Sequence, residues 1–331
     1  MIVTVTPNPT LDRTYHVDEL RLGELHRADY NAVEASGKGV NVSRVLLGLG
    51  VPTIAVLPLG GREGNEIAGL LTAAGLDHRA VRVRGAARVN ITITEPGGRT
   101  TKVNGPGEPM TGEEQDALVR KAGQAASESR AEWLAICGSL PPGTGSDLVV
   151  RLIHAAHSAG ARVAVDTSGA ALAAALMAGA DLVKPNREEL AELTGRALPA
   201  IRDVAAAAME LTGAGATVLA TVGAEGAVLV DRDRCLWAAA PSIEPVNTAG
   251  AGDTLLAGYL GSGLDDPEGR LAEAVALGTS ACLTKGTVER PGRSISPADI
   301  TVRRLDRDKT SGASKENPAT GKAAGETRRS S

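Results

Sequence analysis

The chain has 331 residues, of which 43% are hydrophobic and 2% aromatic, and its formal net charge at pH 7 is −4. This weakly acidic balance argues against a nucleic-acid partner, and the shortage of aromatic rings argues against base stacking. No stretch approaches the roughly 20 apolar residues of a membrane span, so no membrane partner is expected. The three cysteines lack metal-ligand spacing and residues 1–6 predict a strand instead of a signal peptide, so a cytoplasmic protein is expected.

Short β-branched runs alternate with helical patterns between about residues 40 and 285. In the helical patterns, apolar side chains recur at i, i+3 and i+4 spacing, as they do at Val42, Val45 and Leu46. This alternation predicts an α/β fold in which a doubly wound, mostly parallel sheet carries helices on both faces. Strands are expected at residues 54–59, 133–137, 163–166, 181–184 and 217–222.

Two parts of the chain depart from this alternation of strands and helices, and they predict a second, smaller β-sheet. Residues 12–18 and 28–34 are expected to form two short strands, and residues 88–95 and 99–104 a hairpin. In the first strand of the hairpin, Val and Ile alternate with polar residues, which is typical of a sheet with one apolar face. We expect this small sheet to project from the main domain as a lid, a dimer contact or both.

The domain organisation follows from these patterns and from the composition of the C-terminus. One domain is expected over residues 1–308, with its lid strands within about 12–34 and 88–104. Residues 309–331 are mostly small or polar and show no periodicity, so we expect a disordered tail.

A glycine-rich loop at residues 247–254 runs directly into an apolar helical pattern. Gly250 and Gly252 let the backbone approach a ligand closely, and the start of a helix favours an anion. Asp253 lies at this helix start, where its negative charge would oppose a bound phosphate. We therefore interpret Asp253 as a base that accepts a proton from an attacking hydroxyl, and not as a group that binds phosphate. The structural alternative is that Asp253 is the N-cap of the helix. The loop predicts a phosphoryl-transfer site.

Four further turns carry residues suited to the same chemistry. Residues 35–42 form a glycine-rich turn that opens a helix, and residues 137–143 follow a strand end, where open α/β sheets bind ligands. Asn186 and Glu189 lie three positions apart at a helix start, so both could face the water shell of a magnesium ion. Residues 221–226 join two strand-like runs and could contact a nucleotide. Each turn also has a purely structural alternative as a tight turn or helix cap.

Taken together and in chain order, these motifs resemble the ribokinase-like carbohydrate kinases, specifically the phosphofructokinase B group. The resemblance spans residues 2–300, and within the group it is strongest to hexose-phosphate kinases, the 1-phosphofructokinases in particular. The motifs are Thr6-Pro7-Asn8-Pro9 with Asp12, the Gly-Lys-Gly-Val-Asn turn, Gly-Ser-Leu-Pro-Pro-Gly, Lys-Pro-Asn with Glu189, residues 223–226, and the Gly-Ala-Gly-Asp loop.

The resemblance also implies a role for each matching residue. Asp253 matches the catalytic base, and Gly250, Ala251 and Gly252 match the anion hole of the transferring phosphoryl group. The substrate-binding positions are Asp12, Gly37, Lys38, Asn41, Arg88, Asn90 and Ser139. The ATP-binding positions are Lys184, Asn186, Thr221, Gly223, Ala224, Glu225, Gly226 and Gly252. Asn186 and Glu189 match positions that bind magnesium, with water between the ion and the protein.

The implied activity is ATP- and Mg²⁺-dependent phosphorylation of a ketohexose phosphate, with fructose 1-phosphate converted to fructose 1,6-bisphosphate. Tagatose 6-phosphate and fructose 6-phosphate are the alternative substrates, because similar sugars could share one site. A sugar-phosphate sensor without catalysis is the alternative from another class, and an intact Asp253 loop argues against it. The resemblance further implies a homodimer formed through the lid.

Overall fold

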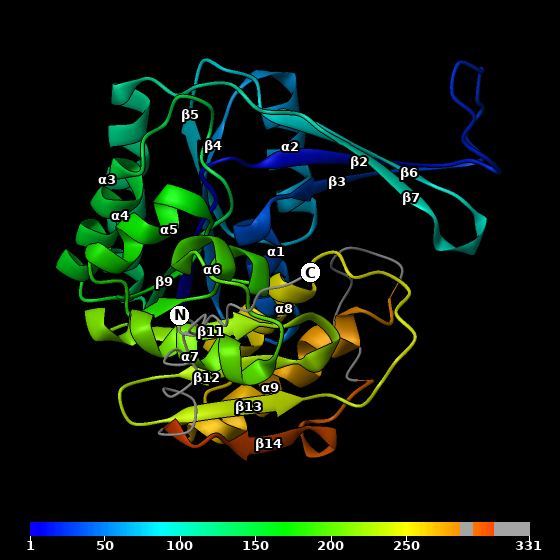
Figure 1. The fold of residues 1–331 in the computed structure, drawn as a ribbon. Coiled ribbons are helices and arrows are strands. Elements are labelled where there is room, and N and C mark those ends of the chain that lie inside the picture. Colours follow the sequence, from blue (N-terminus) through cyan, green and yellow to red (C-terminus); the bar gives the residue numbers. More distant parts are fainter. Residues whose placement is uncertain (285–293, 308–331) are drawn as a thin grey trace, which may run out of the picture.

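The computed structural model describes residues 1–284 and 294–307, so the expected tail lies outside the described residues. A large sheet runs through the molecule in the order β14-β13-β12-β11-β10-β9-β8-β1-β4-β5, and a separate sheet has the order β3-β2-β6-β7 (Figure 1). The strands of the large sheet are β1 (Ile2–Val5), β4 (Thr53–Leu59), β5 (His78–Arg82), β8 (Trp133–Cys137), β9 (Arg162–Asp166), β10 (Leu182–Val183), β11 (Thr217–Thr221), β12 (Ala227–Val230), β13 (Cys235–Ala239) and β14 (Thr301–Arg304).

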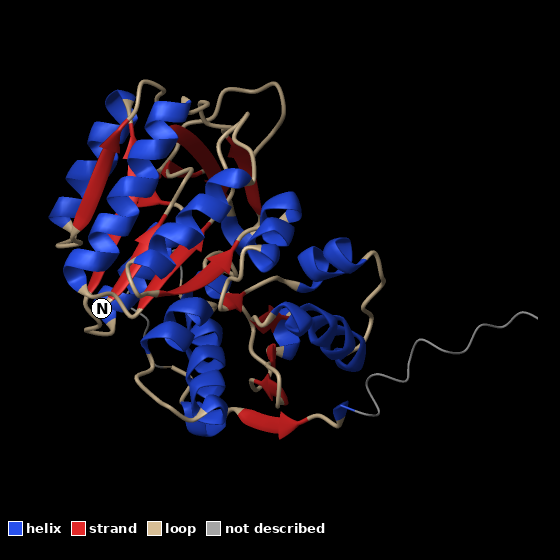
Figure 2. Cartoon of the chain, turned by 90° about the vertical axis from the view of Figure 1, so that its left-hand side faces the viewer, coloured by secondary structure: helices blue, strands red, loops and turns tan. Residues whose placement is uncertain are grey.

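The helices connect the parallel strands and lie on both faces of the large sheet (Figure 2). From β5 to β11 neighbouring strands are parallel, which confirms the expected α/β architecture. Strands β12, β13 and β14 pair antiparallel at one edge. The α-helices are α1 (Lys38–Gly48), α2 (Gly61–Ala73), α3 (Gly112–Ser129), α4 (Asp147–Ser158), α5 (Gly169–Met177), α6 (Arg187–Thr194), α7 (Ile201–Leu211), α8 (Ala251–Gly261) and α9 (Pro267–Ala281).

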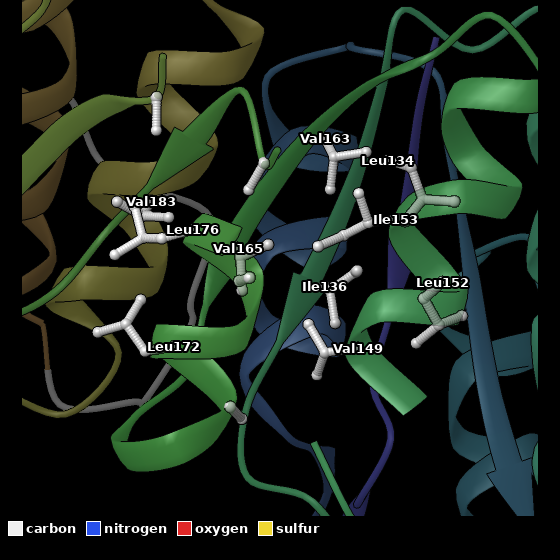
Figure 3. Packing of buried hydrophobic residues seen from close by; sticks show 14 of the residues in the cluster. Leu134, Ile136, Val149, Leu152, Ile153, Val163, Val165, Leu172, Leu176 and Val183 are labelled. Carbon is white, nitrogen blue, oxygen red and sulfur yellow. The ribbon is translucent and has the colours of Figure 1, made fainter. Parts of the chain in front are cut away.

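The core on one face of the large sheet is built from aliphatic side chains. Ile153 of α4 packs against strands β8 and β9, where Leu134 and Val163 are fully buried (Figure 3). A second core on the opposite face includes Leu46 of α1 and Leu256 of α8. Because both faces are covered, the central strands are apolar on both sides, as their sequences predicted.

The small sheet projects from the large one as a lid, which confirms the expected second sheet (Figure 1). Its base is anchored by apolar contacts, since Leu11 and Ala35 share a buried cluster with Ile67 of α2. Its strands are β2 (Thr10–His16), β3 (Tyr30–Ser36), β6 (Arg88–Thr94) and β7 (Thr100–Asn104). Across the described part of the chain, we find no helix that is long and apolar enough to cross a membrane.

Candidate active site

The candidate site lies at the carboxyl ends of the parallel strands, where β8, β9, β10 and β11 end beside the start of helix α8. Asp166 is the last residue of β9, and Lys184 follows β10 directly. Thr221 ends β11 and forms an isolated parallel bridge with Asn186. Open α/β sheets bind ligands at this edge, because the loops that follow neighbouring strands converge there.

Helix α8 presents Asp253 in its first turn without using it as a cap. Gly250 is the N-cap residue, with φ of 79°, and no side chain caps the helix. The Asp253 carboxylate is instead bound by the side chain of Asn41 in α1, where Nδ2 donates to Oδ2 over 2.8 Å. The N-cap alternative for Asp253 is therefore wrong. The first amides of α8 have no side-chain partner, so they can bind an anion.

The environment of Asp253 raises the pKa of its carboxyl group to about 6. Burial is the largest cause, because the residue is 7% exposed, and the negative charge of Asp166 adds to it. The Asn41 hydrogen bond, Lys184 and Lys38 act in the opposite direction and lower the pKa. A carboxylate with a pKa near 6 is largely ionised at pH 7 and is a stronger proton acceptor than an ordinary aspartate.

Two lysines from different parts of the chain share the carboxylate of Asp166. Lys38 Nζ lies 2.8 Å from Oδ1 and Lys184 Nζ lies 3.0 Å from Oδ2. Lys38 Nζ is also 4.0 Å from Oε1 of Glu189. Burial alone would lower the pKa of Lys38, but Asp166, Asp253 and Glu189 together raise it above its usual range. Both lysines were expected at the site, whereas Asp166 was not.

Asp166 could have been found from one feature of the sequence. A charged residue closes the apolar run of residues 163–166, at the end of a strand that was expected to be buried on both sides. Such a carboxylate must be paired or exposed in a site loop, because an unpaired buried charge is very costly. The sequence could not show which cations would surround it.

The glycines of the turn before α1 have a structural explanation in the fold. A Cβ atom on Gly39 would lie 2.4 Å from the Thr6 hydroxyl, and one on Gly37 would lie 2.7 Å from the Thr6 methyl group. Gly37 also has a φ of 121°. The turn therefore packs tightly against the end of β1, so close ligand approach is not needed to explain these glycines. That packing fixes the start of α1, from which Lys38 and Asn41 extend.

On the lid side, four of the expected substrate-binding residues form a second group. Asn90 Nδ2 donates to Asp12 Oδ1 over 2.9 Å, and both residues occupy opposite positions on β6 and β2. Arg88 lies two residues before Asn90 on the same face of β6, and burial lowers its pKa. Ser139 accepts a 3.4 Å hydrogen bond from Asn8. Among the described residues, the buried Nε of Arg88 has no hydrogen-bond partner, whereas Nη1 donates to the Gly105 carbonyl over 3.5 Å.

The residues expected on the nucleotide side form helix caps and turns in this structure. The side chains of Asn186 and Glu189 cap α6 reciprocally, with bonds of 2.7 and 2.8 Å to backbone amides. The helix cap, which was the structural alternative, is confirmed for both residues, and their magnesium role stays a prediction. Within residues 1–284 and 294–307, no group of three or more His, Cys, Asp or Glu side chains is placed to hold a metal ion.

The turn from Gly223 to Gly226 connects β11 to the antiparallel strand β12. Its conformation is fixed by backbone bonds, and Glu225 forms an ion pair with Arg187 of α6. The carbonyl of Glu225 accepts a 2.8 Å hydrogen bond from the indole of Trp237. Ala224 lies within this turn. These contacts place the turn beside the start of α6, so the expected nucleotide-side residues do lie together.

Comparison with known proteins agrees with this geometry. A family model described as pfkB family carbohydrate kinase matches residues 6–292. A 1-phosphofructokinase from Rhodobacter capsulatus is 36% identical over 283 residues, which is 84% of this chain and 89% of the relative. Another from Haloferax volcanii is 38% identical, covering 84% of this chain and 88% of the relative. The crystal structure of phosphofructokinase-2 from Escherichia coli in complex with fructose-6-phosphate has a TM-score of 0.78 at 31% identity, with 85% of this chain and 93% of that chain covered.

The fold is ribokinase-like, as the sequence predicted. The chain belongs to the pfkB family of carbohydrate kinases.

Proposed function

We propose that this protein transfers the γ-phosphoryl group of ATP to the C6 hydroxyl of fructose 1-phosphate and so forms fructose 1,6-bisphosphate. The 1-phosphofructokinases among its relatives support this substrate. The observation that carries the proposal is the buried Asp253 carboxylate, bound by Asn41 at the uncapped start of α8. A proton acceptor and an anion-binding helix start then lie next to each other.

In the proposed reaction, Asp253 accepts the proton of the attacking hydroxyl while the α8 amides stabilise the transferring phosphoryl group. Phosphoryl transfer depends mainly on the alignment of the reactants and on stabilisation of the charge on the phosphoryl group. A fixed base and preorganised hydrogen-bond donors are therefore enough for the protein to catalyse it. Gly252 keeps the helix start accessible because no side chain covers its amide. Lys38 and Lys184 add positive charge beside the reacting groups.

The nucleotide-side residues also fit a magnesium ion that is bound mainly through water and phosphate. Mg²⁺ usually keeps several waters and takes one or two protein carboxylates in such sites. Glu189 uses Oε2 for the helix cap, which leaves Oε1 directed toward the Lys38 ammonium group. When bound, the ion would neutralise charge on the nucleotide phosphates. Asn186 and Glu189 would then hold its water shell.

We assign the recognition of the sugar's own phosphate to Arg88 and Asn90 of the lid, together with Ser139. A guanidinium with an unpartnered, buried Nε is suited to a charge-assisted bond with phosphate. Asp12, held by Asn90, would bind sugar hydroxyls next to it. Closure of the lid over these groups would exclude water and limit hydrolysis of ATP.

The direct test compares five acceptors under the same conditions. ADP release with Mg²⁺ and ATP is measured for fructose 1-phosphate, fructose 6-phosphate, tagatose 6-phosphate, fructose and ribose. We expect the highest kcat/KM for fructose 1-phosphate. A higher value for another phosphohexose would contradict the substrate, a preference for an unphosphorylated sugar would contradict the role of Arg88, and ATP binding without turnover would indicate a sensor.

The pKa of Asp253 in the ligand-free protein leads to a specific pH dependence of kcat/KM. Because the base must be ionised and its pKa is about 6, kcat/KM should be flat above pH 7. At pH 5 it should fall to about one tenth of the plateau. The Asn41→Ala variant loses a hydrogen bond that lowers this pKa, so its acid limb should move to higher pH. A limb at the same pH in both proteins would point to the substrate phosphate instead of Asp253.

We also propose a cytoplasmic homodimer that associates through the lid. Ile91 and Val103 lie opposite each other on β6 and β7 and are 38% and 60% exposed, so the lid displays apolar side chains to solvent. The three cysteines are free thiols, as expected in a reducing compartment. Light scattering should give twice the chain mass of 33.7 kDa, and a monomer would contradict the association.

A further inference from the structure

Asp166 occupies a central position that none of the roles above uses. Its side chain is fully buried, and it is the only carboxylate among the described residues that pairs with both Lys38 and Lys184. Burial alone would raise its pKa, but the two lysines lower it below the ordinary value, so the group is ionised at neutral pH. One buried negative charge therefore links a lysine of the sugar side to a lysine of the nucleotide side.

The backbone around Asp166 holds this carboxylate in a fixed place. Its carbonyl accepts a 2.8 Å hydrogen bond from the amide of Gly138, and the hydroxyl of Thr167 donates to the Gly138 carbonyl over 2.9 Å. The end of β9 is thereby tied to the loop that carries Ser139. A side chain anchored in this way can orient flexible partners, because its own position does not depend on them.

The two lysines bind different oxygens of the Asp166 carboxylate. A Cβ atom on Gly252 would lie 3.4 Å from Lys184 Nζ, so this ammonium group lies against the anion-binding start of α8. Lys38 Nζ lies 4.0 Å from Oε1 of Glu189, and its side chain is 38% exposed. Without the carboxylate, the repulsion between the two ammonium groups would drive them apart.

We propose that Asp166 is a positioning residue that holds Lys38 and Lys184 in place beside the transferring phosphoryl group. This inference rests on the proposed function, because it assigns both lysines to the substrates of that site. Asp166 also acts on the base, since its charge faces Asp253 across the site. The other charged or titratable groups that face Asp253 are Lys38 of α1, Lys184 after β10 and the Cys137 thiol at the end of β8.

The two effects of Asp166 on the pKa of Asp253 oppose each other. Its own negative charge raises that pKa, whereas the two lysines that it holds lower it. A lower pKa of Asp253 in Asp166→Asn therefore reports the lost charge of Asp166 and does not measure where the lysines lie. The KM values for ATP and the sugar phosphate report the positions of the lysines.

The experiment compares Asp166→Asn with Asp181→Asn in the full-length protein. Asp181 is the control, because its carboxylate accepts a hydrogen bond from the Val163 amide at the opposite end of the strands, away from the site. The pKa of Asp253 is measured by carbon-13 NMR of its carboxyl group without ligands, and Asp253→Asn identifies the signal. Steady-state kinetics then give kcat and the KM values for ATP and the sugar phosphate.

For Asp166→Asn we expect the pKa of Asp253 to fall by about 1 unit, as for a change in one nearby charge. Both KM values should rise roughly tenfold, because each substrate loses a well-placed ammonium group. Asp181→Asn should change neither quantity. Unchanged KM values in a folded Asp166→Asn protein would overturn the proposal, whether or not the pKa of Asp253 falls.

If Asp166→Asn does not fold, Asp166→Glu keeps the charge and displaces it by one methylene group. We then expect a nearly unchanged pKa of Asp253 and higher KM values for both substrates, whereas wild-type KM values would overturn the positioning role. The dissociation constants of ATP and of the sugar phosphate, measured by calorimetry, require no turnover. A wild-type protein that phosphorylates none of the five acceptors would therefore contradict the proposed function, while a comparison of these constants between wild type and Asp166→Asn still decides the role of Asp166.

Discussion

Asp253→Asn is expected to lower kcat by about 10²- to 10⁴-fold, which is the usual contribution of a general base. The amide has nearly the same shape as the carboxylate but cannot accept the proton of the attacking hydroxyl. Because the side chain is held by Asn41 and lies in the first turn of α8, the substitution should preserve the helix start. Binding of ATP, measured by calorimetry, should change little.

The matched control for this substitution is Asp265→Asn, which removes an exposed carboxylate from the loop between α8 and α9. This variant should retain the wild-type kcat. If Asp253→Asn turned over at a rate similar to that of the control, Asp253 would not be the base. A parallel loss of ATP binding would instead mean that its main role lies in the structure of the loop.

Gly226→Ala is expected to lower the free energy of unfolding by about 3 kcal/mol or more, because a forbidden backbone conformation and a steric clash act together. Gly226 has φ of 94° and ψ of −125°, a region that is open only to glycine. A Cβ atom there would lie 1.9 Å from the carbonyl oxygen of Ala238 in the neighbouring strand. Neither atom can move away without separating β12 from β13.

Gly223→Ala provides the comparison within the same turn. Gly223 has φ of 61°, but a Cβ atom there would meet no other atom within 4 Å. We expect this variant to lose only about 1 kcal/mol, the cost of a left-handed conformation for alanine. Chemical denaturation of both variants measures the difference. Equal stabilities would show that the strand contact at Gly226 relaxes at little cost.

The sequence predicted best those features that a short stretch of neighbouring residues determines. The loop that ends in Asp253 could be placed at a helix start because the glycines and the following apolar spacing are both local features. The alternation of Val and Ile with polar residues in residues 88–95 predicted the lid for the same reason. In both cases the deciding information lies within a few consecutive residues.

Features that depend on distant partners could not be predicted in this way. Asp166 is important because it pairs with Lys38 and Lys184. These residues are distant in the sequence, and only the packing of α1, β9 and β10 brings them together. Gly226 was expected on the nucleotide side, and the sequence could not show that the close approach of β13 also requires glycine there. Strands β12 and β13 are antiparallel because short turns precede them, and a pattern of buried runs does not distinguish such turns from crossovers.

The most direct test of the account is the identity of the product made from fructose 1-phosphate. Wild-type protein and Asp253→Asn are incubated with ATP, Mg²⁺ and the sugar phosphate, and phosphorus-31 and carbon-13 NMR locate the new phosphate. We expect the wild type to place it on C6, giving fructose 1,6-bisphosphate, and the variant to form almost none. Release of inorganic phosphate without a bisphosphate, or equal product from both proteins, would contradict the account.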